Sequence, residues 1–254
     1  DEMAAPRNKV LALMRRWRQI DVCITKAANE AKDNSKFLST LERFLEPLRS
    51  GTPTQIIDGI PALMNALKMV HTISRFFNTS ERMTKLFMKI TNSMIKSCRL
   101  AINGTDTSAK MWEKPVGPLL EMLETCLRMN EFYQEQYKLT KDKLAQMPTG
   151  RQFDFAEAQL FGKFDLFCRR LIKLIDVFST IQQFRALVEH KLEGMEPLLA
   201  VFDQIIDQFK EKKHDLLDYN TNKFDRDFVE FNVRVGELET SLQHFINRSF
   251  ESIS

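Results

Sequence analysis

The residues that could bind a phosphate group are poorly arranged for that task in this 254-residue chain. The sequence Gly162-Lys163-Phe164 lies inside a helical pattern and lacks both an upstream glycine and the Ser or Thr of a phosphate-binding loop. Such a loop needs glycines because its backbone wraps the phosphates, and it needs the hydroxyl to ligate magnesium. The sequence therefore predicts that the chain neither binds nor hydrolyses ATP.

Metal binding and acid–base catalysis also lack a suitable pattern. The histidines are far apart, without Cys, Asp or Glu partners at metal-ligand spacing; they are His71, His190, His214 and His244. The sequence has no nucleophile elbow of the form GxSxG. The carboxylates follow helical surface spacing, where they form weak i,i+4 pairs more often than they act as general acids. We expect no catalytic residue, no metal, no cofactor and no small-molecule substrate, so the chain is not predicted to be an enzyme.

The four cysteines are far apart in the sequence, and each falls on an apolar helical stripe: Cys23, Cys98, Cys126 and Cys168. A buried thiol in a reducing compartment behaves as a small apolar side chain. We expect all four to be reduced core thiols of a cytosolic protein.

Composition bounds the protein class. With 43% hydrophobic and 28% charged residues, the chain has the make-up of a globular protein with a substantial core. Its net charge of +3 is too small to indicate nucleic-acid binding, and no nucleic-acid partner is expected. No run of about 18 apolar residues occurs, so no membrane insertion is expected. The start DEMAAPRNKV has no apolar stretch after a charged one, so it does not resemble a signal peptide.

The apolar residues recur every three or four positions and the chain has only 8 Gly and 8 Pro, which predicts an all-α protein. In the first half, helices are expected over residues 6–31, 36–48, 54–77 (bent around Pro61), from 80 to a stop at Gly104, and from Pro115 or Pro118 to 146. The first would bury one apolar face, made of Val10, Leu13, Met14, Trp17, Ile20 and Ile24. Residues 1–147 are thus predicted to form a helical bundle of about five helices.

The second half follows a break at residues 147–151, where Pro and Gly interrupt the pattern. Beyond it, apolar residues alternate three and four positions apart over long stretches, with three heptads between Phe224 and Phe245. A turn at residues 218–222 lets the last two helices fold back on each other. Residues 153–254 are predicted to form a long-helix bundle that ends in an antiparallel helical hairpin. The whole is expected to be an elongated stack of antiparallel helical bundles, with coiled-coil-like packing in the C-terminal half.

Two features could serve a partner. Arg15, Arg16 and Arg18 place three guanidinium groups around Trp17, a composition that is enriched at protein interfaces. The other interpretation puts Trp17 in the core and the arginines in water. Four phenylalanines lie at helix ends or in loops, where they either pack internally or await a partner: Phe153, Phe155, Phe224 and Phe250.

Five stretches of the chain resemble the N-terminal tail of dynein heavy chains, most closely those of the axonemal outer arm. They are KFLSTLERFLEPL (36–48), HTISRFFNTSERMTKLFMKITNSMIKSC (71–98), FDFAEAQLFGKFDLFCRRLIKLID (153–176), HKLEGMEPLL (190–199) and NKFDRDFVEFNVRVGELE (222–239). None of them is a catalytic signature. The likeness rests on many ordinary helical residues in a particular order.

The resemblance implies a non-catalytic stem segment of a much larger motor, whose ATPase ring lies far downstream and whose chain would be cut at both ends here. Such tails bind dynein intermediate and light chains, neighbouring heavy chains or docking proteins, in the cytoplasm, the cytoskeleton and the cilium axoneme. The alternative is a free-standing cytosolic helical adaptor or tethering protein unrelated to a motor. An enzyme ranks third.

Overall fold

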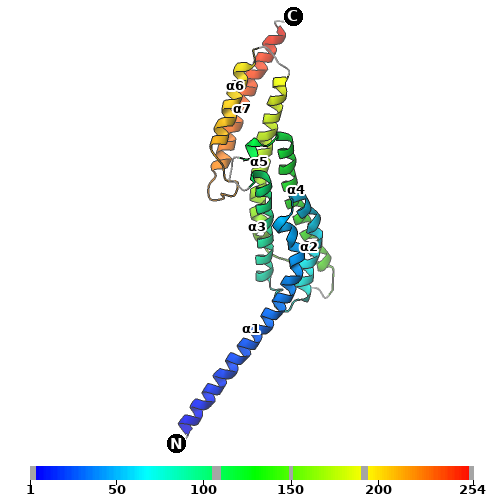
Figure 1. The fold of residues 1–254 in the computed structure, drawn as a ribbon, viewed down its shortest axis with the longest axis vertical. Helices are drawn as coiled ribbons and strands as arrows, with labels where there is room; N and C mark the ends of the chain where they lie inside the picture. The colour runs from blue at the N-terminus through cyan, green and yellow to red at the C-terminus, as the bar shows by residue number, and fades with distance from the viewer. Residues whose placement is uncertain (1–3, 105–109, 149–150, 190–193, 252–254) are drawn as a thin grey trace.

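A computed structural model describes residues 4–104, 110–148, 151–189 and 194–251, and within these ranges the protein is all-α, as predicted. Its elements are α1 (Ala4–Ser50), α2 (Pro53–Ile73), α3 (Ser80–Asn103), the short 3₁₀ helix η1 (Lys110–Glu113), α4 (Val116–Ala145), α5 (Glu157–Glu189), α6 (Glu196–Glu211) and α7 (Lys223–Glu251). The helices stack along one long axis (Figure 1), which confirms the elongated arrangement of bundles. Coiled-coil packing in the C-terminal half stays a prediction.

Helix α1 is a single helix, so the expected break between residues 31 and 36 is wrong. Side-chain contacts to α3 and to the connection between α2 and α3 stabilise this stretch as a helix. Arg82 donates to the carboxylate of Glu30, and the carboxylate of Asp33 accepts from the backbone N–H of Arg75 at 3.2 Å. The first half of the chain consequently has four α-helices and one 3₁₀ turn among its described residues, rather than five helices.

The ends of α2 and α3 are set by capping residues and by a glycine. Thr52 and Gln55 form a reciprocal capping box at the start of α2, and the hydroxyl of Thr79 accepts from the N–H of Arg82 at the start of α3. Gly104 ends α3 with a φ of 68°, which a residue with a Cβ adopts only at a cost. Helix α2 ends at Ile73, four residues before the expected end.

We call the part of the molecule formed by the C-terminal half of α1, α2, α3, α4 and the first part of α5 the lower body. Its core lies between these helices. The apolar positions that recur every three or four residues on α3 and α4 are buried: Met83, Leu86, Phe87, Ile90, Met94, Cys98, Leu119, Leu123, Cys126, Met129, Tyr133 and Tyr137. Phe153 and Phe155 are buried too, in edge and tilted contact with the rings of Phe87 and Tyr137. Their interpretation as surface for a partner is therefore wrong.

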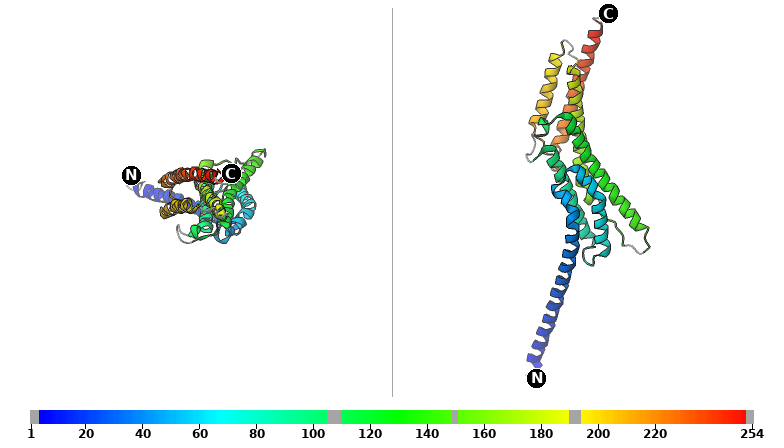
Figure 2. Two further views of the ribbon diagram at one scale, coloured as in Figure 1. Left: turned by 90° about the horizontal axis from the view of Figure 1, so that it is seen from above. Right: turned by 45° about the vertical axis from the view of Figure 1, so that its right-hand side comes forward.

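The upper body joins α5 to a pair formed by α6 and α7, which lie side by side and run in opposite directions (Figure 2). Phe209 of α6 packs against Phe231 of α7 with ring centroids 5.4 Å apart, and Phe224 is buried beside them. Phe224 is thus a core residue, whereas the side chain of Phe250 and all of His190 lie outside the described part of the chain. The division into domains 1–147 and 153–254 stays a prediction.

Candidate functional site

The most conspicuous surface lies on the N-terminal half of α1, which projects from the body as a lone helix (Figure 1). Every side chain from residue 7 to residue 29 is exposed. The face expected to be buried is therefore open to solvent: Val10, Leu13, Met14, Trp17, Ile20 and Ile24 are all exposed, with Trp17 at 66%. Large apolar side chains seldom gather in such numbers on an uncovered helix, so the surface is suited to a partner.

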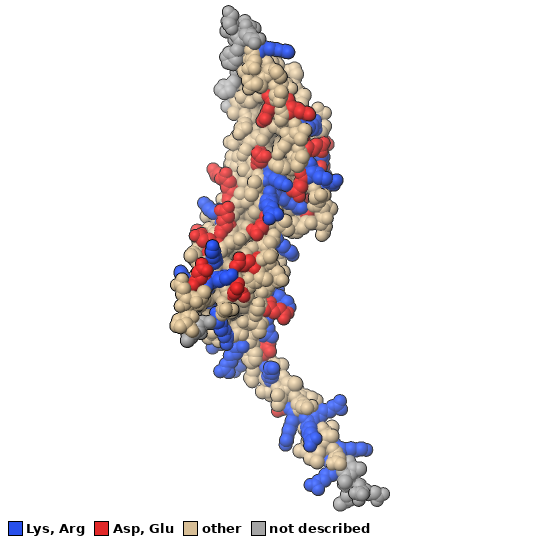
Figure 3. Space-filling model, turned by 180° about the vertical axis from the view of Figure 1, so that it is seen from behind, with Lys and Arg blue, Asp and Glu red and all other residues tan. Residues whose placement is uncertain are grey.

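Basic side chains surround this apolar face. Arg15, Arg16 and Arg18 lie with Trp17 on the projecting helix, and Arg7, Lys9 and Lys26 extend the charge along it. Figure 3 shows the blue side chains gathered around this part of the molecule. The interpretation that puts Trp17 in the core of this chain is wrong. Binding of a partner by Arg15, Arg16, Trp17 and Arg18 stays a prediction.

Five of the apolar residues of this segment form a row along one side of the helix, whereas Leu11, Met14 and Val22, which are also exposed, lie off it. Val10, Leu13, Trp17, Ile20 and Ile24 follow one another at intervals of three and four residues, and we call them the outer stripe. Residues repeated at these intervals lie along one face of a helix. Farther along the same helix, Phe37 and Leu41 are buried against the body. Apolar side chains of α1 are thus covered by this chain near one end of the helix and uncovered near the other.

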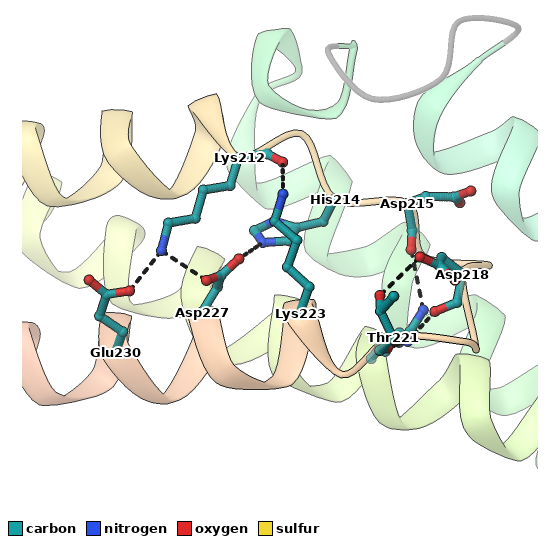
Figure 4. A network of polar contacts seen from close by, with 9 residues as sticks. Lys212, His214, Asp215, Asp218, Thr221, Lys223, Asp227 and Glu230 are labelled. Atoms are coloured by element: carbon teal, nitrogen blue, oxygen red, sulfur yellow. Dashed lines mark hydrogen bonds and ion pairs between the residues drawn. The ribbon is translucent and has the colours of Figure 1, made fainter.

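A second cluster of polar side chains connects α6 to α7 (Figure 4). The carboxylate of Asp227 lies 2.7 Å from Nε2 of the buried His214 and accepts from Nζ of Lys212 at 2.9 Å. Lys212 also donates to Glu230 at 2.7 Å. Although burial alone would raise it, the hydrogen bonds from Lys212 and His214 hold the pKa of Asp227 below its ordinary value. Because Asp227 already holds two donors, the cluster fastens the end of α6 to α7 and is poorly suited to acid–base chemistry.

The imidazole of His214 is packed as a core ring. It lies 4.8 Å from the ring of Phe209 and 5.2 Å from that of Phe224. Burial lowers its pKa, against the opposing effect of Asp227. Within the described residues, no group of three or more His, Cys, Asp or Glu side chains could hold a metal ion.

Arg170 is a structural residue that the sequence analysis missed. Its guanidinium group is buried and donates to the backbone carbonyls of the connection between α6 and α7, at Asp215, Leu216, Asp218 and Thr221. A signal was present, because Arg170 stands three residues after Phe167 and four before Leu174, both of them core residues. An open pocket of about 800 Å³ lies beside it, lined in part by Leu166, Arg169, Ile172, Lys173 and Tyr219.

Three of the four cysteines meet the expectation of core thiols. Cys98, Cys126 and Cys168 are buried, and they come from α3, α4 and α5. The neighbouring Cys126 and burial raise the pKa of the Cys98 thiol well above its ordinary value, and burial raises that of Cys168 to about 12. Thiols held in the protonated form react slowly. Cys23 is exposed on the projecting part of α1, so its prediction as a core thiol is wrong.

No helix in the described ranges combines the length and apolar character that a membrane span requires.

Comparison with known proteins gives a consistent result over nearly the whole chain. Residues 5–254 match the family model "Dynein heavy chain, N-terminal region 1". The chain is 46% identical over 240 residues to the dynein gamma chain, flagellar outer arm, of Chlamydomonas reinhardtii, an alignment that covers 94% of this chain and 5% of that protein. It is 42% identical over 251 residues to dynein axonemal heavy chain 5 of Mus musculus, covering 99% and 5%, and 35% identical over 242 residues to dynein axonemal heavy chain 8 of Homo sapiens, covering 95% and 5%.

Proposed function

The chain belongs to the N-terminal region of the dynein heavy chains, and on this premise we propose that it is a non-catalytic tail segment that docks other subunits of an axonemal motor. The observation that carries the proposal is the match over residues 5–254, joined to a helix whose apolar and basic half projects from the body. The comparisons give no support to the alternative of a free-standing adaptor. The partners would be dynein intermediate and light chains, neighbouring heavy chains or docking proteins.

The setting follows from the relatives, whose names place them in flagellar outer arms and axonemes. The chain spans 5% of the length of each of these relatives, so a motor activity would reside in the rest of such a protein. We propose that the segment acts within the axonemal cytoskeleton of a cilium, as a scaffold of an ATP-driven microtubule motor. It would bind no ATP itself, and calorimetry should find no saturable nucleotide binding in the micromolar range.

Removal of this segment from its heavy chain tests the docking role. A cell that expresses the heavy chain without residues 5–254 of this sequence should lose the dynein arm from its axonemes, because the subunits have lost their scaffold. The ATPase activity of the extracted heavy chain should remain. Electron microscopy of axonemes and an ATPase assay measure the two effects. Normal arms on such axonemes would contradict the proposal.

The arginine cluster has a finer test. Replacing Arg15, Arg16 and Arg18 together by Glu should reduce incorporation of the heavy chain into the arm, because the positive charge that attracts the partner changes sign. Circular dichroism of the 254-residue chain should show unchanged helical content, since exposed charge changes are nearly neutral for folding. Unchanged incorporation would mean that the cluster only faces solvent.

A further inference from the structure

We infer that the outer stripe docks a helix of another polypeptide, and that this helix carries its own heptad row of apolar residues flanked by Asp and Glu. The inference rests on the proposed docking function and names the chemistry of the partner. It concerns the segment 7–29, all of whose side chains are exposed.

The spacing of the outer stripe selects a helix as the partner. Alternation of three and four residues gives a narrow row, and a narrow row is covered by one facing helix at a shallow crossing angle. Trp17 stands near its middle, where a large aromatic side chain contributes most to binding.

The charge of the segment selects an acidic partner. Residues 7–29 contain six Lys or Arg against one acidic residue, Asp21, although the whole chain carries only +3. Lys9 and Arg16 each precede a member of the outer stripe by one residue, which puts them at the edge of the row. Acidic side chains at the matching edge of the partner would be attracted, whereas a second copy of this basic segment would be repelled.

One residue disfavours an anionic membrane as the occupant. Asp21 follows Trp17 by four residues and therefore lies on the same face of the helix. A carboxylate beside the apolar row costs free energy at an anionic lipid surface, where interfacial helices keep basic residues at the boundary. Against a partner helix, the same carboxylate lies at the rim of the contact, where it stays hydrated.

A designed peptide probes this surface directly. The probe is a fluorescent four-heptad helical peptide with Leu at its apolar positions and Glu at the flanking positions; a second peptide carries Lys in place of Glu. Titration of each peptide with the 254-residue protein, followed by fluorescence anisotropy, should show saturable binding of the acidic peptide. The basic peptide should bind at least about tenfold more weakly, and salt should weaken the acidic complex.

The helix offers matched controls on its opposite side. Ile24 belongs to the outer stripe and Val22 does not, yet their exposed fractions are 63% and 64%. Ile24→Ala should weaken binding of the acidic peptide about fivefold or more, and Val22→Ala less than about twofold. A second pair of variants tests the charge. Arg16 lies at the edge of the row, whereas Arg15, two residues before Trp17, lies on the far side of the helix. Arg16→Glu should weaken binding several-fold more than Arg15→Glu.

Equal effects within each matched pair would overturn the inference. So would equal affinity for the two peptides, or binding of the segment to anionic phosphatidylserine vesicles with no binding of the acidic peptide. Self-association through the stripe, seen by sedimentation velocity and abolished by Ile24→Ala, would also overturn it. The arm-assembly experiment with residues 5–254 removed is independent of the peptide. Loss of arms in that experiment together with failure of the peptide test would contradict the inferred chemistry of the partner and leave the proposed docking function in place.

Discussion

At the scale of single residues, the upper body depends on aromatic rings that interlock between α6 and α7. Phe231 is 3% exposed and packs on Phe209. Phe231→Ala should lower the free energy of unfolding by about 3–5 kcal/mol, because the side chain leaves a cavity in addition to the lost transfer energy. Urea denaturation measures the change. The matched control is the exposed Val233, whose replacement by Ala should cost less than about 0.5 kcal/mol; equal costs would contradict the packing.

The cysteines differ in accessibility, and a thiol reagent distinguishes them. Ellman's reagent should modify one thiol of the folded chain quickly, because Cys23 alone among the four is exposed. The remaining three should react only as fast as the body opens, and all four should react in guanidinium chloride. Cys23→Ser should abolish the fast phase, while Cys168→Ser should leave it unchanged. A second fast thiol in the native protein would show that the core between α3, α4 and α5 is open.

Two buried histidines make stability depend on pH. Burial lowers the pKa of His71, with a further contribution from Arg151, and burial also lowers that of His214. The unfolded chain therefore binds more protons than the folded one once the pH falls below about 6.5, and the free energy of unfolding should decrease on acidification. The slope is limited to about 1.4 kcal/mol per pH unit for each histidine.

Urea midpoints at pH 7.5 and 5.5 measure this effect. The double variant His71→Gln, His214→Gln should lose most of the difference between the two pH values. The exposed His244 is the control, and His244→Gln should leave the difference in place. A stability that rises on acidification would contradict the assignment.

At the scale of the elements, periodicity predicted most helices, because burial within a helix bundle repeats every three or four residues, as it does on α3 and α4. It failed at residues 31–36, where Asp33, Asn34 and Ser35 favour caps and turns. The contacts of Glu30 and Asp33 with the corner between α2 and α3 keep this stretch helical, and such distant contacts leave no local signal. Periodicity also cannot tell whether an apolar row meets its own chain or another, so the row around Trp17 was assigned to the core.

The attachment of the α6–α7 pair to α5 depends on Arg170, which is 6% exposed. Arg170→Met keeps much of the volume but leaves backbone carbonyls without a donor, so it should cost about 2–4 kcal/mol. Limited proteolysis should become faster in the connection at residues 212–222. Arg169 is exposed one residue earlier, and Arg169→Met should have little effect on either measurement. Equal proteolysis rates for the two variants would contradict this role.

At the scale of the whole molecule, the stability of the body should not depend on the projecting half of α1. A chain that begins at residue 30 should keep the free energy of unfolding within about 0.5 kcal/mol, because residues 7–29 are exposed throughout. A chain that begins at residue 42 loses Phe37 and Leu41 from the core and should be destabilised by several kcal/mol. Thermal unfolding compares the two. Marked destabilisation of the longer chain would mean that the segment folds back onto the body.

The continuity of α1 has a mechanical consequence. No glycine or proline occurs from residue 7 to residue 46, and such residues are the usual places where a helix kinks. The exposed part extends about 35 Å beyond the body at about 1.5 Å per residue. A tilt of the body by about 5° would displace the tip of a helix of that length by about 3 Å. The helix thus acts as a stiff lever, so that strain applied at the outer stripe reaches the core around Leu41 without being absorbed by a hinge.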